Sequence, residues 1–168
     1  MSELKNFRAE KDRFFATHAQ SPLTHEQGHD FNGLEYFPEN EDLRLEVEVE
    51  AFPEREQILM QTSTGDVQEF VRYGKFRFSV EGAEAELTVF ANQHGFFLPF
   101  VDSLAGAETY PAGRYLDPEP LDDGRFLIDF NLAYNPYCAY NELSSCPLPP
   151  AENRLKVPVR AGEKIFRD

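Results

Sequence analysis

Side chains capable of chemistry crowd into one short stretch of the chain, D-F-N-L-A-Y-N-P-Y-C-A-Y-N at residues 129–141. Its positions hold one Asp, three Asn, three Tyr and one Cys, which is too polar for plain core and too aromatic for a solvated loop. Asn and Tyr side chains recognise ligands by hydrogen bonding and stacking and need no strong nucleophile. We therefore predict a pocket, lined by segments within residues 97–141, that binds a small polar or hydroxylated molecule.

Asp129 and Asn131 are the first residues in this stretch with a predicted role. In the strand-like sequence R-F-L-I-D-F-N, side-chain alternation places both on one face, opposite an apolar face. The pair can exchange hydrogen bonds with a hydroxylated ligand, or Asp129 can act as a base if burial raises its pKa. The alternative is that both side chains only hold the following N-P-Y-C loop. Tyr110, Tyr134 and Asn135 are further predicted ligand-binding residues.

Arg114 lies in the strand-like sequence G-R-Y-L, where a long cation among apolar neighbours needs a carboxylate partner. Asp129, Asp102 and Glu108 are the candidate partners. A guanidinium can instead clamp the carboxylate or phosphate of a ligand, so Arg114 joins the predicted ligand-binding residues. The structural ion pair is the simpler interpretation, because most buried Arg side chains are paired within the fold.

A second hypothesis is catalytic. Asp102 and Glu108 lie in the small-residue loop V-D-S-L-A-G-A-E-T-Y-P, and with Asp129 they are candidate acids and bases for a hydrolase or isomerase, with or without a divalent cation. None of these carboxylates has the spacing of an established metal motif, so no metal site is predicted and any cofactor stays open. A third hypothesis makes the segment a rigid scaffold, with function at a protein-interaction surface.

The histidines and cysteines have weaker patterns. His25 and His29, in H-E-Q-G-H, are four residues apart, a spacing that serves zinc on a helix, but Gly28 weakens a helix there and we interpret both as solvent-exposed. Cys138 and Cys146 do not have the spacing of a redox C-x-x-C pair, and no His lies within their block. We interpret them as buried thiols, with a disulfide or an activated nucleophile as the alternatives.

The composition of the chain limits the classes of molecule that we expect it to bind. Thirty acidic and sixteen basic residues give a net charge of −14, which disfavours nucleic acid and anionic membrane surfaces and suits a protein soluble in concentrated salt. The chain has no P-loop, G-x-G-x-x-G or G-x-S-x-G sequence. It also has no apolar run of membrane-spanning or signal-peptide length, so we expect a cytoplasmic protein; its oligomeric state is not predicted.

The positioning elements are predicted to be mainly β: a β-sandwich or partly open antiparallel barrel with an amphipathic N-terminal helix over residues 3–16. A short helical turn is expected at residues 21–23. Strands are expected at 43–50, 57–64, 67–73, 96–101 and 155–159, with 113–116 and 125–130 paired to each other. A hairpin over 75–90 is predicted to turn at Gly82-Ala83, pairing Val80 with Ala85, Phe78 with Leu87 and Phe76 with Val89. One domain over residues 1–168 is expected, with a helix and irregular hook in 1–40 and the antiparallel core in 41–168.

Several segments resemble one family. F-L-P-F-V-D, E-T-Y-P-A-G-R-Y-L, D-F-N-L-A-Y-N-P-Y-C-A-Y and C-P-L-P-P-A-E-N-R-L are similar to a widespread prokaryotic family of uncharacterised proteins, classed only as a domain of unknown function. The earlier segments K-D-R-F-F, S-P-L, F-N-G-L-E-Y-F-P and T-S-T-G also resemble it, so the likeness extends over nearly the whole chain. The resemblance supports one domain and implies no particular activity.

Overall fold

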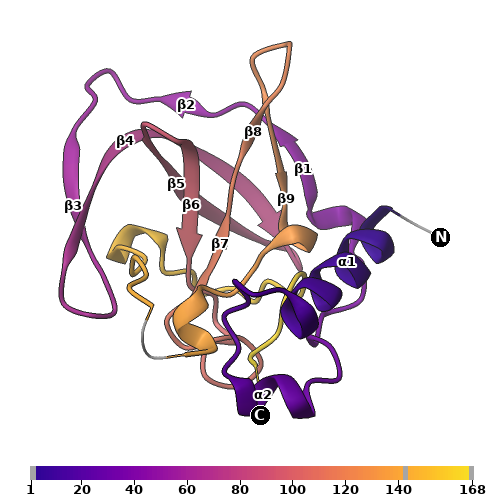
Figure 1. Cartoon of the computed structure of the whole chain (residues 1–168). Helices are drawn as coiled ribbons and strands as arrows, with labels where there is room; N and C mark the ends of the chain where they lie inside the picture. Colours follow the sequence, from indigo (N-terminus) through magenta and orange to yellow (C-terminus); the bar gives the residue numbers. More distant parts are fainter. Residues whose placement is uncertain (1–2, 142–143, 167–168) are drawn as a thin grey trace.

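Alternating and apolar runs of the sequence form two antiparallel sheets (Figure 1). The computed structural model of the protein describes residues 3–141 and 144–166. The smaller sheet has the order β1-β9-β8, formed by β1 (Arg44–Val47), β9 (Phe126–Asp129) and β8 (Glu119–Pro120). The larger has the order β2-β4-β5-β6-β7, with β3 also paired to β4; its strands are β2 (Glu50–Ala51), β3 (Gln57–Gln61), β4 (Val67–Val80), β5 (Ala83–Asn92), β6 (Gly95–Phe100) and β7 (Arg114–Leu116).

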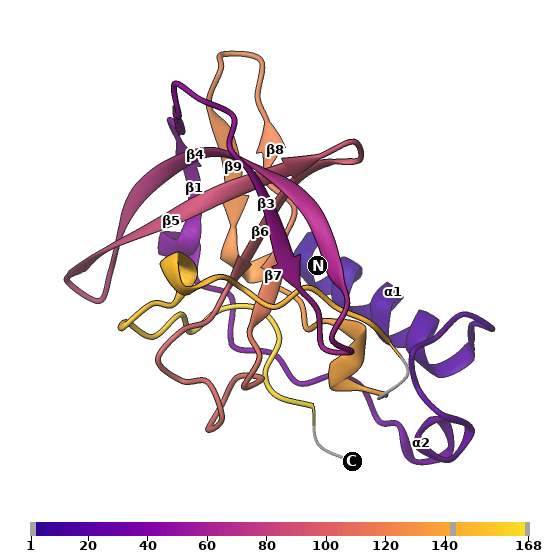
Figure 2. The same ribbon diagram turned by 90° about the vertical axis from the view of Figure 1, so that its left-hand side faces the viewer.

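The helices lie together on one side of the sheets in both ribbon views (Figures 1 and 2). The predicted N-terminal helix is confirmed as α1 (Glu3–Thr17), which buries Phe15 against the rings of Phe31 and Tyr140. The helical turn expected at residues 21–23 is wrong. The helix α2 (His25–Asp30) begins later, because the side chains and backbone amides of Thr24 and Gln27 cap it reciprocally.

The predicted hairpin forms, but its turn is one residue earlier than expected. Glu81 and Gly82 have φ values of 49° and 83°, so both central positions are left-handed, as a type I′ turn requires. Val80 therefore pairs with Ala83, Phe78 with Ala85 and Phe76 with Leu87. Since the register moves by two residues, the same side chains still face the core.

Two further strand predictions are wrong. The segments near 113–116 and 125–130 do not pair with each other: β7 pairs with β6 in the larger sheet, and β9 pairs with β1 and β8 in the smaller one. Residues 155–159 are not a strand. Pro158 has no N–H, and the amide of Val159 donates to the Asp102 carboxylate at 2.8 Å rather than to a neighbouring strand.

One large hydrophobic cluster joins the two sheets. Phe126, Ile128 and Phe130 of the β9 segment contribute from the smaller sheet, and strands β4 to β7 contribute from the larger, in part through Phe78 and Phe100. The ring of Phe130 stacks on Phe78 at 5.1 Å and meets Phe100 edge-on at 5.3 Å. Figure 2 shows β4 and β5 passing across β1 and β9. The protein is thus mainly β, with an N-terminal helix and sheets that do not close into a barrel.

The remaining elements are 3₁₀ turns that shape the loops. They are η1 (Glu41–Leu43), η2 (Phe130–Leu132), η3 (Tyr137–Ala139) and η4 (Ala151–Asn153). Two of them, η2 and η3, lie within residues 129–141, so this polar stretch leaves strand β9 as short turns and not as a long strand.

Candidate functional site

The side chain of Arg114 is sealed inside the fold. Its Nη1 donates to the carbonyl oxygens of Ala161 and Glu163 at 2.5 and 3.0 Å, and its Nη2 donates to that of Val159 at 2.9 Å. The carboxylate of Asp102 lies 3.7 Å from Nη2, so Asp102, and not Asp129 or Glu108, is the ionic partner. Burial lowers the pKa of Arg114 to about 10, although Asp102 opposes the shift. Arg114 therefore holds segment 159–163 against the sheet.

Asp102 is as fully engaged as its partner. Its Oδ1 accepts from the Thr109 hydroxyl at 2.7 Å, and its Oδ2 accepts from the Val159 amide at 2.8 Å. Glu108, in the same loop, is exposed. The two carboxylates predicted to act as acid and base thus have opposite surroundings, one closed by internal bonds and one in solvent.

Asp129 and Asn131 connect strand β9 to the segment before β1. Asp129 accepts from the amide and the side chain of Asn131 at 3.0 and 2.9 Å, and so caps η2. Asn131 in turn exchanges two hydrogen bonds with the backbone of Asn40, at 2.8 and 2.9 Å. Both residues border a groove with Leu4 and Phe7 of α1, away from Arg114. The catalytic role proposed for Asp129 stays a prediction.

Tyr134 and Asn135 do line a substantial cleft. We call it the Tyr134 cleft; its volume is about 570 Å³, and it lies between the ends of β4, β5 and β6, the strand β7 and the segments around 134–137 and 144–147. Its lining residues are Gln68, Phe70, Asn92, His94, Gly95, Phe96, Phe97, Tyr115, Asp117, Tyr134, Asn135, Pro136, Tyr137, Ser144, Ser145, Cys146 and Pro147. Of the six predicted ligand-binding residues, only Tyr134 and Asn135 belong to this set.

Aromatic rings in mutual contact form one wall of the cleft. Phe97 stacks on Phe70 at 5.3 Å and meets Tyr115 edge-on at 4.7 Å, and Tyr115 meets Tyr134 at 5.8 Å. The backbones of Tyr115 and Tyr134 exchange two hydrogen bonds, at 2.8 and 3.0 Å. The hydroxyl of Tyr134 donates to Asp117 at 2.9 Å, and burial, with Asp117 nearby, raises the pKa of Tyr134. The rings are therefore fixed before any ligand arrives.

Asn135 carries an unused hydrogen-bond acceptor in this cleft. Its amide nitrogen Nδ2 donates to the carbonyl of Lys164 at 2.9 Å, which fixes the orientation of the side-chain amide. Its Oδ1 is buried and has no hydrogen-bond partner within residues 3–141 and 144–166. A buried carbonyl oxygen without a donor is rare in folded proteins.

A buried carboxylate behind the cleft was missed by the sequence analysis. Glu163 is 2% exposed; it pairs with Lys11 of α1 and accepts from the Tyr140 hydroxyl at 2.8 Å and the Asn135 amide at 3.1 Å. The ammonium of Lys11 also lies 5.2 Å from the centre of the Tyr134 ring. Lys11 and Glu163 are 152 residues apart. The sequence shows Lys11 among the apolar positions of an amphipathic helix, but this pattern does not indicate that Glu163 is its partner.

Asn153 is a second residue whose role appears only in three dimensions. It is fully buried, with Oδ1 accepting from the Thr88 amide at 2.8 Å and Nδ2 donating to the carbonyls of Thr88 and Pro99 at 2.9 and 2.8 Å. Asn153 thus joins η4 to strands β5 and β6. Within the C-P-L-P-P-A-E-N-R-L segment, Asn153 therefore has a structural role.

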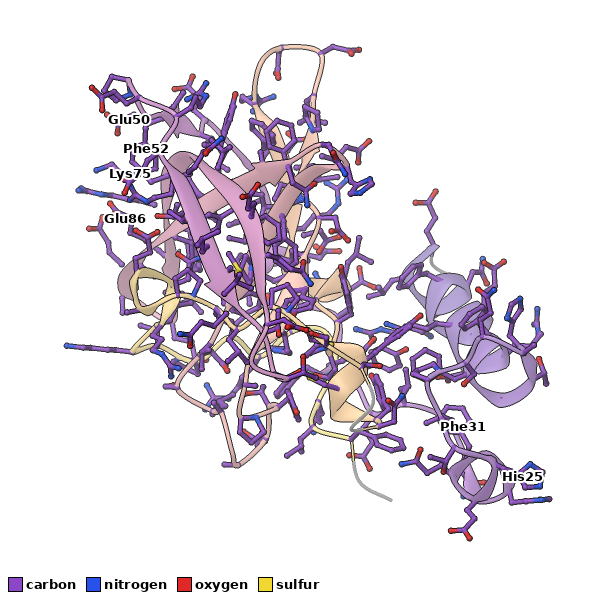
Figure 3. All side chains as sticks on the ribbon, turned by 60° about the vertical axis from the view of Figure 1, so that its left-hand side comes forward. His25, Phe31, Glu50, Phe52, Lys75 and Glu86 are labelled. Carbon is purple, nitrogen blue, oxygen red and sulfur yellow. The ribbon has the colours of Figure 1, made fainter. Side chains whose placement is uncertain are left out.

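The two histidines of α2 lie at the periphery. Figure 3 shows His25 far from the sheet residues Glu50 and Lys75. H-E-Q-G-H has the letters of the H-E-x-x-H zinc motif, and the Nε2 atoms of His25 and His29 are 3.3 Å apart. Zinc centres use further protein ligands, and within the described residues no three His, Cys, Asp or Glu side chains gather in a way that could hold a metal.

No helix in the described part is long and apolar enough to cross a membrane.

Comparisons with known proteins agree with this fold. In a solved structure, the solution NMR structure of an uncharacterized protein from Haloarcula marismortui, the TM-score is 0.72 at 39% sequence identity. The match covers 96% of this chain and 92% of that one. No curated protein matches. The family model described as "Protein of unknown function (DUF1684)" matches residues 29–164, which include every predicted site residue. The chain therefore belongs to the DUF1684 family of proteins of unknown function.

Proposed function

We propose that the Tyr134 cleft binds a small, uncharged, hydroxylated molecule with at least one flat apolar face. The observation that carries the proposal is the aromatic wall formed by Phe97, Tyr115 and Tyr134, with the polar side chain of Asn135 among the other lining residues. Asn and Tyr side chains in such a lining can exchange hydrogen bonds with the hydroxyl groups of a ligand.

The aromatic wall of the cleft suits a flat ligand face. The rings of Phe97, Tyr115 and Tyr134 contact one another and hold fixed orientations, so a flat ligand face can stack without first ordering the site. Tyr137 also lines the cleft and is 44% exposed, which leaves part of its ring available to a bound molecule. An aromatic lining with a small number of polar groups is typical of small-molecule sites.

The polar groups of the rim support an uncharged ligand. Gln68, Asn92 and His94 are exposed and lie at the ends of β4 and β5, where they can donate or accept hydrogen bonds. Asp117 adds a carboxylate to the same cleft, and the net charge of −14 makes the approach of an anion unfavourable. The volume of about 570 Å³ is within the range of small-molecule sites.

The test is a binding screen with named probes and matched variants. D-glucose, myo-inositol and adenosine are titrated into the isotopically labelled protein, and amide chemical shifts are followed by NMR. We expect at least one probe to shift resonances of the cleft residues, and Tyr137→Ala and Asn92→Ala to weaken that binding by about tenfold, the effect of losing about 1.4 kcal/mol. Asp123→Asn, in the exposed turn before β9, is the control that should retain wild-type affinity.

Two results would contradict the proposal. One is a probe that binds equally well to the wild type and to both cleft variants, since its site would then lie elsewhere. The other is an anionic probe, such as inorganic phosphate, that binds the cleft more tightly than all three neutral probes.

A further inference from the structure

Cys138 and Cys146 are brought together at the border of the Tyr134 cleft. Both are free thiols, and the backbone amide of Cys138 donates to Sγ of Cys146 at 3.3 Å. The two side chains are close enough for each to shift the ionisation of the other. Cys146 lines the cleft, whereas Cys138 lies in η3, immediately after the lining residues Pro136 and Tyr137. The sequence analysis interpreted both as buried thiols, with a disulfide as one alternative, and the structure places the two residues in contact.

The position of Cys146 is fixed by the turn between β3 and β4. The amide of Ser63 donates to the carbonyl of Cys146 at 2.9 Å, and the Cys146 amide donates back to the Ser63 hydroxyl at 3.1 Å. The hydroxyl of Ser145 bonds both Thr62 and Thr64, at 2.9 and 2.7 Å. The T-S-T-G segment therefore holds Cys146 in place.

The surroundings of Cys138 favour its thiolate. The hydrogen bond from the Cys146 thiol lowers the pKa of Cys138 to about 6, against the effect of burial, and the hydroxyls of Tyr110 and Ser63 contribute. The Tyr110 hydroxyl lies 3.7 Å from Sγ of Cys138. The same shared hydrogen bond, together with burial, raises the pKa of Cys146. One thiol is therefore prepared as a nucleophile and the other remains protonated beside it.

The two thiols also differ in access. Cys138 is half-buried, so a small reagent can reach it, whereas Cys146 is 7% exposed. An accessible thiolate next to a protected thiol is the arrangement of an attacking and a resolving cysteine. Tyr110, predicted as a ligand-binding residue, here contacts a sulfur.

We propose that Cys138 and Cys146 form a redox-active pair that hydrogen peroxide oxidises to an intramolecular disulfide and that a dithiol reduces. The Cys138 thiolate attacks one peroxide oxygen; the S–O bond forms, the O–O bond breaks, and hydroxide leaves and takes a proton to become water. The Cys146 thiol, after losing its proton, attacks the sulfenic sulfur; the S–S bond forms and the S–O bond breaks, with loss of a second water. The pair loses two electrons, which peroxide gains.

The first experiment counts thiols in the full chain. The reduced protein is treated with hydrogen peroxide, denatured, and assayed with a chromogenic disulfide reagent, by intact mass and on a non-reducing gel. We expect two reactive thiols before treatment and none after it, a monomeric product lighter by two hydrogens, and recovery of both thiols with dithiothreitol. Two thiols that persist under conditions that oxidise glutathione, or a disulfide found only between chains, would overturn the proposal.

Single variants then separate the two roles. In Cys146→Ser, peroxide should leave a sulfenic acid at Cys138 that dimedone traps, and no disulfide. In Cys138→Ser, Cys146 should react with peroxide at least about tenfold more slowly than Cys138 does in Cys146→Ser, because Cys146 is buried and burial disfavours its thiolate. Equal reactivity of the two cysteines in the two variants would contradict the assignment. If either variant fails to fold, peptide mapping of the oxidised wild type still identifies the Cys138–Cys146 bond or its absence.

Tyr110→Phe tests the surroundings of Cys138. The rate of iodoacetamide alkylation of Cys138 is measured against pH in the wild type and in this variant. We expect an inflection near pH 6 in the wild type and a move to higher pH in Tyr110→Phe, because one donor to the thiolate is lost. Tyr73→Phe, on β4 between Phe96 and Phe126, is the matched control and should leave the profile unchanged. A wild-type inflection at the pH of an ordinary thiol would overturn the role of Cys138.

Discussion

Nη2 of Arg114 lies 3.7 Å from Oδ2 of Asp102, and each of the two side chains is 1% exposed. Neither charge can be hydrated, so each depends on the other and on the backbone groups around it. The pair connects β7 and the loop after β6 to segment 159–163, through the Val159 amide and three carbonyl oxygens. Its role is to hold that segment in place.

Asp102→Asn should be strongly destabilising. The substitution leaves the buried charge of Arg114 without a counterion, and removing one partner of a buried pair costs about 3–5 kcal/mol. Urea denaturation followed by circular dichroism measures the loss. Glu86→Gln is the control, because it removes one partner of the exposed Arg77–Glu86 pair and should leave the urea midpoint nearly unchanged. Comparable losses in both variants would mean that burial does not determine the cost.

Glu163→Gln should loosen α1. The change leaves Lys11 without its carboxylate and weakens the bonds that Glu163 accepts from Tyr140 and Asn135. Hydrogen exchange of the α1 amides, read by mass spectrometry, should accelerate more than tenfold, whereas exchange in β5 should change less. Lys11→Met serves as the comparison from the other partner. Protection of α1 that is unaltered in both variants would show that the ion pair does not anchor the helix.

Gly113→Ala should cost more than Gly124→Ala. Both glycines have positive φ, 99° and 86°, so alanine is strained at either site, by about 1–3 kcal/mol. At Gly113 the new Cβ would also lie 2.6 Å from the carbonyl oxygen of Phe100, whereas at Gly124 it meets open space. The difference in unfolding free energy between the two variants measures the cost of the close contact between the new Cβ and the carbonyl oxygen of Phe100. Equal destabilisation would indicate that the backbone beside Phe100 relaxes freely.

Stability should fall as the pH rises above about 10. Burial raises the pKa of Tyr36, Tyr115 and Tyr140 well above the ordinary tyrosine value of about 10. Above that pH the unfolded chain releases protons that the folded chain retains, so the free energy of unfolding decreases with pH. Tyrosinate absorbance should therefore rise cooperatively, in step with loss of circular dichroism. Full ionisation while the fold persists would contradict the burial of these hydroxyls.

Added salt should stabilise the protein. With a net charge of −14, the folded chain concentrates negative charges that repel one another. Raising NaCl from about 0.1 M to about 1 M shortens the Debye length from about 10 Å to about 3 Å. We expect the urea midpoint to increase over this range, and substitution of exposed acids such as Glu84→Lys to reduce the dependence. A midpoint independent of salt would contradict this expectation.

The alternation of apolar and polar residues predicted well which side chains of a strand face the core, because one face of each strand is buried. The Phe126 and Ile128 side chains do reach the core, and the hairpin faces survive a two-residue error in register. The turn was misplaced because Gly82 suits the first central position of one turn type and the second of another, and Glu81 accepts a φ of 49°. The pairing of β7 with β9 failed because the chain changes sheets within Asp117-Pro118.

The site was harder to predict because its decisive contacts link distant parts of the chain. Composition identified Tyr134 and Asn135, but no local pattern connects them to Gln68 or Phe97 across the cleft. Arg114 and Asp129 were expected to meet because both are polar residues on neighbouring predicted strands, and those strands belong to different sheets. The two thiols meet because the turn at Ser63 fixes Cys146, a contact that sequence spacing does not encode.

The hydrogen bonds between Arg114 and segment 159–163 can form only late in the synthesis of the chain. A ribosome releases β7 and the Asp102 loop long before residues 159–163, which provide three carbonyl acceptors for Arg114 and the carboxylate for Lys11. Until then the nascent sheet contains a guanidinium that lacks these acceptors, and its burial is unfavourable. Closure of the core should therefore occur late, after nearly all of the described residues have left the ribosomal exit tunnel.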